Sequence, residues 1–164
     1  MKEIQLNQSR PCKNMGKYVA LVDDEDFEYI NQWKWCVAKN GNLFYAVRTI
    51  TIDGKRRNLC MHNAVLKGKG IDHIDNNGLN NQKSNLRFCT VSENDMNNRK
   101  QENTSSIYKG VTFEKRVKKW KATIQINGKS FYLGHFTSEV EAAKAYNAKA
   151  IALFCEFANL NIID

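Results

Sequence analysis

The sequence has no apolar run long enough to cross a bilayer, and residues 1–10 contain no apolar signal-peptide core. We therefore expect no membrane partner and a protein that stays in the cytoplasm. Five cysteines are present, but their number is odd and no two of them form a CxxC pair. This spacing indicates neither a zinc ribbon nor a disulfide framework, so no zinc is expected.

Acidic residues are in the minority, since the formal net charge is +8 and the pI is about 9.3. Residues 109–129 hold seven lysines and arginines but one acidic residue. A basic block beside aromatic residues favours nucleic acid as the partner. An anionic membrane surface would more often use a basic amphipathic helix. The alternative is a basic surface that only keeps the protein soluble.

The chain of 164 residues fits one ordinary domain or two small ones. Asn40-Gly41 and Asp53-Gly54 each lie between runs of β-branched and aromatic residues, which is a strong hairpin signal. Residues 17–60 therefore predict a small antiparallel sheet. A short helix is expected near residues 24–32, because acidic side chains would fill its first turn.

The last third of the chain alternates apolar and polar residues around Asn127-Gly128, as expected for two strands of a hairpin. Lys109 to Phe113 predicts a preceding strand. A helix should then begin at Thr137 or Ser138, with acidic residues in its first turn and alanines along its length. The prediction is three strands with one helix on one face. The opposite face, polar and basic, would suit a nucleic-acid groove.

Residues 72–103 are rich in asparagine and contain few apolar residues, so they predict either a linker or a loop-rich site held by a few apolar side chains. Asp72 offers an oxygen ligand for a hard cation, and His73 can accept a proton near neutral pH. Asn94 offers a second oxygen ligand. Ser92 and Asp95 form an S-x-x-D capping signature, which predicts a short helix. The alternative is that Asp72 and His73 lie on an ordinary surface loop.

The pattern D-H-x-[DN]-x-[NG], followed by S-N-L-R and S-x-N, resembles the HNH nucleases, and most closely the phage and intron-encoded homing endonucleases. Residues 17–35 and Met61-His62 also resemble the region before the motif in those proteins. The resemblance implies a ββα-metal fold, in which a hairpin and a helix surround one divalent ion.

The resemblance also implies roles for individual residues. His73 would be the general base that activates water, and Asn85 would hydrogen-bond the histidine and fix its orientation. Asp72 and Asn94 would hold Mg²⁺ or Mn²⁺. Arg87 is a candidate phosphate contact. Two alternatives remain open for His62, a phosphate contact or simple packing, while His135 is expected to be structural or on the surface.

Residues 107–161 resemble a second family, the AP2 DNA-binding domain, through Tyr108 to Val111, Trp120, Leu133-Gly134 and the alanine-rich helix. That family inserts a three-stranded sheet into the major groove. The resemblance implies core positions for Trp120, Ile124 and Leu133. It also implies that the following residues face DNA: Lys109, Thr112, Lys121, Thr123, Gln125, Ser130 and Tyr132.

Together these observations predict an α+β protein. Residues 1–98 would form an N-terminal β region with the HNH core at about 61–98, residues 99–107 a linker, and 108–164 the AP2-like domain. The predicted function is a metal-dependent DNA endonuclease of mobile-element type. It would act on double-stranded DNA as a monomer or weak dimer in the cytoplasm or nucleoid of a host cell. The alternatives are a DNA-binding regulator with an inactive HNH centre and an RNA-binding module.

Overall fold

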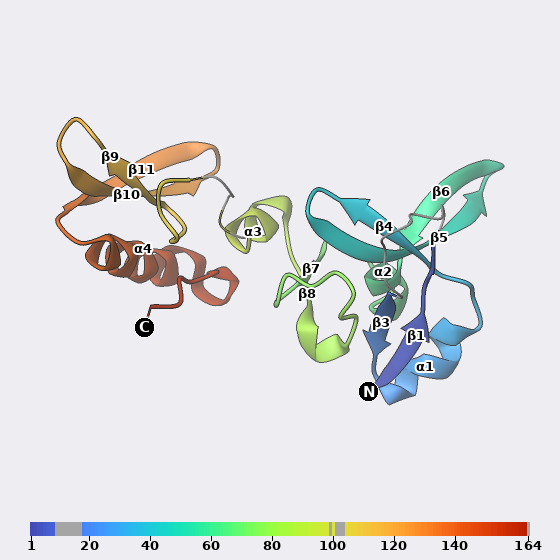
Figure 1. Cartoon of the computed structure of the whole chain (residues 1–164). Coiled ribbons are helices and arrows are strands. Elements are labelled where there is room, and N and C mark those ends of the chain that lie inside the picture. Colours follow the sequence, from blue (N-terminus) through green and yellow to red (C-terminus); the bar gives the residue numbers. More distant parts are fainter. Residues whose placement is uncertain (9–17, 99, 101–103, 164) are drawn as a thin grey trace. The chain divides into compact units, whose positions relative to one another are not determined.

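The computed structural model describes residues 1–8, 18–98, 100 and 104–163. It divides into two compact units, Met1–Cys89 and Thr90–Asp164 (Figure 1). Small, mostly antiparallel sheets and a few helices build both units, so the predicted α+β class is confirmed. The boundary between the units precedes the expected linker at 99–107, and residues 99 and 101–103 of that linker lie outside the described residues.

Two small sheets and two helices form most of the first unit. Strands β1 (Lys2–Gln5) and β3 (Val19–Val22) pair antiparallel. A four-stranded sheet has the order β2-β4-β5-β6, with strands β2 (Asn7–Gln8), β4 (Cys36–Asn40), β5 (Leu43–Ile52) and β6 (Lys55–Cys60). The helices are α1 (Asp24–Asn31) and α2 (Met61–Val65).

The prediction for residues 17–60 is confirmed for the acidic helix and for the strands after it. The segment before the helix differs, because β3 pairs with β1 and not with the later strands; residue 17 lies outside the described residues. At the second hairpin Asp53 and Gly54 both have positive φ, as predicted. The first turn is one residue later than expected, since Asn40 still pairs with Leu43 and Gly41 alone in the turn has positive φ.

A buried apolar core holds the first unit together. Trp35, Ile30, Met61 and Val22 are fully buried in it. The indole Nε1 of Trp35 donates to the backbone oxygen of Ile30 at 2.9 Å, so the one polar atom of this large side chain is paired.

A short hairpin completes the first unit. Strands β7 (Ile71–His73) and β8 (Leu86–Phe88) pair antiparallel. The loop between them includes the 3-10 turn η1 (Lys83–Asn85). Ile71 and Leu86 pack against the apolar core, which holds both strands in place. The loop at 74–85 is thus ordered although it has few apolar residues.

The second unit contains the predicted three-stranded sheet and helix. Its sheet has the order β11-β10-β9, formed by β9 (Val111–Glu114), β10 (Lys119–Ile126) and β11 (Lys129–Phe136). Helix α4 (Glu139–Phe154) packs on one face, and η2 (Cys155–Phe157) follows it. Ser138 is the N-cap and accepts from the backbone of Val140. Ile124 is buried, while Trp120 and Leu133 are partly buried against the same core, as predicted.

Helix α3 (Val91–Met96) begins the second unit. The predicted cap at Ser92 and Asp95 is wrong, because a complete capping box lies two residues earlier. Thr90 Oγ1 accepts from the backbone of Glu93, and Glu93 Oε2 accepts from the backbone of Thr90. The side chains of Thr90 and Glu93 thus accept from the two backbone amides at the start of the helix. Ser92 and Asp95 do not form such a reciprocal pair here. Asn94 is therefore the fourth residue of the helix.

Within the described residues, every helix is too short or too polar to cross a membrane.

Candidate functional site

Asp72 and His73 lie side by side on β7, and each is only 5% exposed. Their partners across the ladder are Arg87 and Leu86. Successive side chains of a strand point to opposite faces, so the hairpin directs the carboxylate and the imidazole to different surroundings. The apolar core under Leu86 explains why this short polar strand is buried at all.

Asp72 forms a buried ion pair with Arg87. The Nε and Nη2 atoms of Arg87 donate to Asp72 Oδ2 at 3.1 and 2.8 Å. The side chains are 6% and 14% exposed, so the pair is largely withdrawn from water. The sequence offered Arg87 as a phosphate contact; in the structure its guanidinium compensates the charge of the predicted metal ligand.

The ring of His73 belongs to an aromatic cluster with His62 and Tyr45. The ring centroids of His62 and His73 are 4.9 Å apart, and the ring of Tyr45 lies 5.9 Å from that of His73 in an edge-to-face arrangement. Burial lowers the pKa of His73, against the opposing effects of Asn81, Asp75 and Asp72. His73 is therefore a neutral imidazole at neutral pH, the form that can accept a proton.

Asn81 contacts the ring of His73 directly. It is completely buried, and its Oδ1 lies 3.4 Å from His73 Nε2. Its Nδ2 donates to the backbone oxygen of Leu79, which fixes the amide with the oxygen toward the histidine. Its backbone nitrogen donates to Leu21 on β3. The contact was predicted for Asn85, but the structure gives it to Asn81.

Asn85 instead holds the loop that carries Asn81. Its Nδ2 donates to Asp75 Oδ1 and to the backbone oxygen of Asn80, both at 2.9 Å, and its Oδ1 accepts from the backbone of Asp75. Burial opposes ionisation of Asp75, but hydrogen bonds from Asn80, Asn77 and Asn85 outweigh it and lower the pKa of the carboxyl. Asn85 thus acts on His73 through the loop and not by direct contact.

Asn94, the other predicted metal ligand, lies on α3 in the second unit, so its pairing with Asp72 stays a prediction. Among the described residues, no three or more His, Cys, Asp or Glu side chains gather where they could hold an ion. A carboxylate and an amide oxygen are nevertheless hard donors, which fit Mg²⁺ or Mn²⁺ by chemistry.

The sheet of the second unit has one face free of helix α4, which we call the open face. Cross-strand pairs place Lys121 beside Thr112 and His135, Thr123 beside Tyr132, and Gln125 beside Ser130. The residues of the open face are Thr112, Glu114, Lys119, Lys121, Thr123, Gln125, Ser130, Tyr132 and His135. Six of the seven residues predicted to face DNA therefore lie together on one surface.

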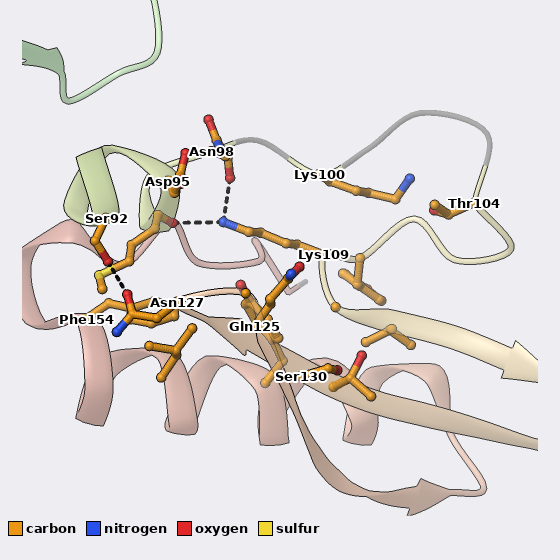
Figure 2. Close-up of a pocket in the computed structure, with 18 of the residues that line it drawn as sticks. Ser92, Asp95, Asn98, Lys100, Thr104, Lys109, Gln125, Asn127, Ser130 and Phe154 are labelled. Carbon is orange, nitrogen blue, oxygen red and sulfur yellow. Dashed lines mark hydrogen bonds between the residues drawn. The ribbon is translucent and has the colours of Figure 1, made fainter. Parts of the chain in front are cut away.

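Lys109 is the exception, because its ammonium is bound inside the unit. It donates to the backbone oxygens of Met96 and Asn98 at the end of α3 (Figure 2). Burial lowers the pKa of Lys109 to about 8. The predicted contact with DNA stays a prediction, but the structure gives this lysine an architectural task.

Helix α3 and part of the open face border a pocket of about 880 Å³ (Figure 2). Ser92 Oγ on α3 donates to Asn127 Oδ1 in the β10–β11 turn at 2.7 Å. Thr123, Gln125 and Ser130 line the sheet side of this pocket. The start of α3 is thereby attached to the β10–β11 turn, and its end to Lys109, which precedes β9.

A chain of hydrogen bonds crosses the open face. Tyr132 Oη lies 2.6 Å from His135 Nδ1, and His135 Nε2 lies 2.8 Å from Glu114 Oε2. The chain joins β11 to β9 across the central strand. The hydrogen bond from His135 is the main cause that lowers the pKa of Glu114, and Lys121 and Arg116 add to it.

The chain buries an Asp-His pair on a short hairpin of its first unit and carries a three-stranded sheet with one helix in its second unit. It is 33% identical over 155 residues to an uncharacterized HNH endonuclease of Acanthamoeba polyphaga mimivirus, covering 88% of this chain and 75% of the viral one. No family model and no solved structure matches it. The similarity to the viral protein extends along most of both chains, so this chain belongs to the HNH endonuclease family.

Two further relatives match shorter stretches. Protein 3.8 of Escherichia phage T7 is 38% identical over 65 residues, which are 40% of this chain and 54% of the phage protein. An AP2-like ethylene-responsive transcription factor of Arabidopsis thaliana is 39% identical over 59 residues, 36% of this chain and 12% of the plant protein. The chain therefore spans about half of the phage protein and a small part of the plant factor.

The sequence did not single out Asn81, Tyr45 or Glu114. Asn81 is one of several asparagines in its loop, and no spacing rule separates the buried one from the others. His135 lies partly exposed on the open face, which agrees with the expected structural or surface position. A β-bulge in β11 shifts the register between Tyr132 and Gly134, and it moves His135 to the open face. In the sequence, the signal for this bulge is a glycine inside a strand, Gly134.

Proposed function

We propose that this protein is a metal-dependent DNA endonuclease of the homing, mobile-element type. The observation that carries the proposal is the buried Asp72-His73 pair, whose imidazole is kept neutral by burial and oriented by Asn81. Membership of the HNH family supports it.

His73 is the general base of the proposed reaction. With Nε2 of the ring donating to Asn81 Oδ1, the proposed basic atom is the other ring nitrogen, Nδ1. Nδ1 removes the proton from the water that attacks the phosphodiester phosphorus. A fixed, neutral base of this kind contributes about 10²–10⁴-fold to a reaction rate.

Asp72 and Asn94 are the proposed ligands of Mg²⁺ or Mn²⁺. When bound, the ion supplies Lewis-acid stabilisation of negative charge on the phosphate and on the departing 3′ oxygen. Arg87 pairs with Asp72 and holds one of its two oxygens, Oδ2, in place.

The open face of the second unit is the proposed surface for double-stranded DNA. It combines lysines with short hydrogen-bonding side chains on the sheet face opposite helix α4. The similarity to the AP2-like plant factor supports this assignment. Because phosphate contacts release counterions, the affinity should fall as salt is raised. The protein would act as a monomer or weak dimer on DNA in the cytoplasm or nucleoid.

The test is a plasmid-cleavage assay. DNA fragments that bind the full chain are first selected and cloned into a supercoiled plasmid, which then serves as the substrate. With Mg²⁺ or Mn²⁺, the wild type should convert it to open-circle or linear DNA, and EDTA should stop the reaction. His73→Ala should cut at least about 100-fold more slowly, as expected on loss of a general base. In a gel shift the variant should still bind.

Lys83→Ala is the matched control, because this exposed residue of the same loop makes surface ion pairs with Glu25 and Asp26. It should cut like the wild type. If His73→Ala cuts normally, the base is misassigned. If the wild type binds the plasmid but never cuts it, the protein is a DNA-binding regulator with an inactive HNH centre.

A further inference from the structure

Glu114 stands apart on the open face, because it is the one carboxylate among the nine residues that form this surface. A carboxylate repels phosphate. A sheet that contacted only the DNA backbone would therefore bind more tightly without Glu114. Its neighbours by charge are Lys121 and Arg116. Two explanations compete: Glu114 neutralises these basic residues, or it contacts DNA in its own right.

The geometry around Glu114 favours a contact. The carboxylate is acceptor-only when ionised, so the hydrogen between Glu114 Oε2 and His135 Nε2 belongs to the imidazole. On its other side the imidazole Nδ1 is hydrogen-bonded to Tyr132 Oη. The three side chains are thus linked in the order Tyr132, His135, Glu114. The chain is bonded to one carboxylate oxygen and holds the side chain in place.

The three side chains linked by these hydrogen bonds are also exposed to solvent. Tyr132 is 60% exposed, and the side chains of His135 and Glu114 are 27% and 32% exposed. Three linked side chains with this exposure are not part of the core. Ordering exposed side chains costs conformational entropy. A surface that only keeps the protein soluble gains nothing from this order.

The chemistry of the major groove then limits what Glu114 can contact. Guanine and thymine present carbonyl or ring-nitrogen acceptors there, which repel a carboxylate. Cytosine N4 and adenine N6 are amino donors that a carboxylate accepts from. A fixed carboxylate therefore attracts one class of base and rejects the other, which is how specificity is built.

We propose that Glu114 reads a base in the DNA target by accepting a hydrogen bond from the exocyclic amino group of cytosine or adenine. His135 and Tyr132 are its positioning residues. The inference rests on the proposed binding of DNA by the open face and adds the class of base that is read.

The first experiment selects binding sites for the full chain from random duplexes, with wild type and Glu114→Gln in parallel. The wild type should enrich cytosine or adenine at one position. Glu114→Gln should relax or change the preference at that position by about 10-fold and leave the others unchanged. Glu141→Gln is the matched control, because it removes the same charge from an exposed residue of α4, away from the open face.

The second experiment uses duplexes in which the selected base lacks its amino group: 2-pyrimidinone for cytosine, or unsubstituted purine for adenine. The wild type should bind the modified duplex about 10-fold more weakly, as for loss of one base contact, and Glu114→Gln should not distinguish the two duplexes. The base that shows the effect identifies whether cytosine or adenine is read.

The positioning role is tested with His135→Gln. It should relax the preference at the same position while a thermal unfolding curve still shows a folded second unit. If Glu114→Gln keeps the wild-type preference at every position, the inference is wrong although the sheet binds DNA. If the wild type enriches no sequence and binds no duplex, the proposed DNA-binding function itself fails, and this inference with it.

Discussion

Arg87 faces Asp72 directly across the β7–β8 ladder and places two guanidinium nitrogens on one carboxylate oxygen, at 3.1 and 2.8 Å. Both side chains are mostly buried. Removing one partner of such a pair leaves a buried charge without compensation. The ion pair therefore contributes to the stability of the first unit and at the same time holds Asp72, the proposed metal ligand.

Arg87→Met should destabilise the first unit by about 3–5 kcal/mol, the usual effect of stranding one buried charge. Urea unfolding followed by tryptophan fluorescence measures this. The double variant Asp72→Asn with Arg87→Met should recover part of the loss, because no charge is then stranded. Unchanged stability with weaker DNA binding would mean that Arg87 is the phosphate contact that the sequence suggested.

Asn85 should matter for the loop and Asn81 for the ring of His73. Asn85→Ala loses three side-chain hydrogen bonds and should cost about 2–3 kcal/mol, at roughly 1 kcal/mol for each bond. Amide exchange at Asp75 should accelerate. Asn81→Asp should instead slow plasmid cleavage and change the histidine NMR shifts. Equal loop exchange in both variants would contradict this division of roles.

The stability of the first unit should fall as the pH drops from 6.5 toward 4. Burial, with the neighbouring His73, lowers the pKa of His62 to about 4 from an ordinary 6.5. Above pH 6.5 the ring is neutral in both states, so its contribution is fully present. Between the two values the unfolded chain takes up a proton that the folded chain does not, which destabilises the fold by up to about 3 kcal/mol.

The check is the free energy of unfolding measured every half pH unit, with His62→Gln as the comparison. Glutamine does not titrate, so the variant should lose less stability than the wild type across this range. Parallel curves for the two proteins would show that His62 is protonated in the folded state as readily as in the unfolded chain.

Local patterns predicted most of the fold. Period-two alternation placed β10 and β11, acidic first turns placed α1 and α4, and two of the three Asn-Gly or Asp-Gly turns fell on the expected residues. The errors in strand pairing arose where a strand pairs with a segment that is distant in the sequence. The pairing of β3 with β1 depends on residues far apart in sequence. The bulge between Tyr132 and Gly134 reverses the alternation after it, which the period-two pattern alone does not show.

The candidate site was predictable in residue type but not in contacts. The Asp72-His73 pair was found from the motif, and its burial was not, because it depends on Leu86 packing into the core of the unit. The asparagines of the loop compete for the same partners. Only the folded loop shows that Asn81 faces the histidine and Asn85 faces Asp75.

Lys109 should contribute to stability more than to DNA affinity. Its ammonium donates to two backbone oxygens at the end of α3, so Lys109→Met keeps the apolar stem and removes both bonds. We expect a loss of about 1–2 kcal/mol in the second unit, as for hydrogen bonds from a charged group that is partly offset by relief of its burial. The salt dependence of DNA binding should stay the same. A shallower salt slope would show a lost phosphate contact instead.

Gly110 should be the least replaceable glycine of the second unit. It has φ of 75°, and an added Cβ would lie 2.2 Å from the ring of Tyr146 and 2.6 Å from the backbone oxygen of Thr123. Gly128 has the same φ, but an added Cβ would meet nothing within 4 Å. The two positions thus share the backbone strain of a left-handed residue and differ only in the clash.

Gly128→Ala should cost about 1–2 kcal/mol, the strain of an alanine in the left-handed region. Gly110→Ala should cost that amount and the overpacking of Tyr146 in addition, typically another 1–3 kcal/mol. Thermal unfolding of the two variants measures the difference directly. Equal losses would mean that Tyr146 and helix α4 can shift away from β9 at no cost, and that the contact at Gly110 does not hold the helix on the sheet.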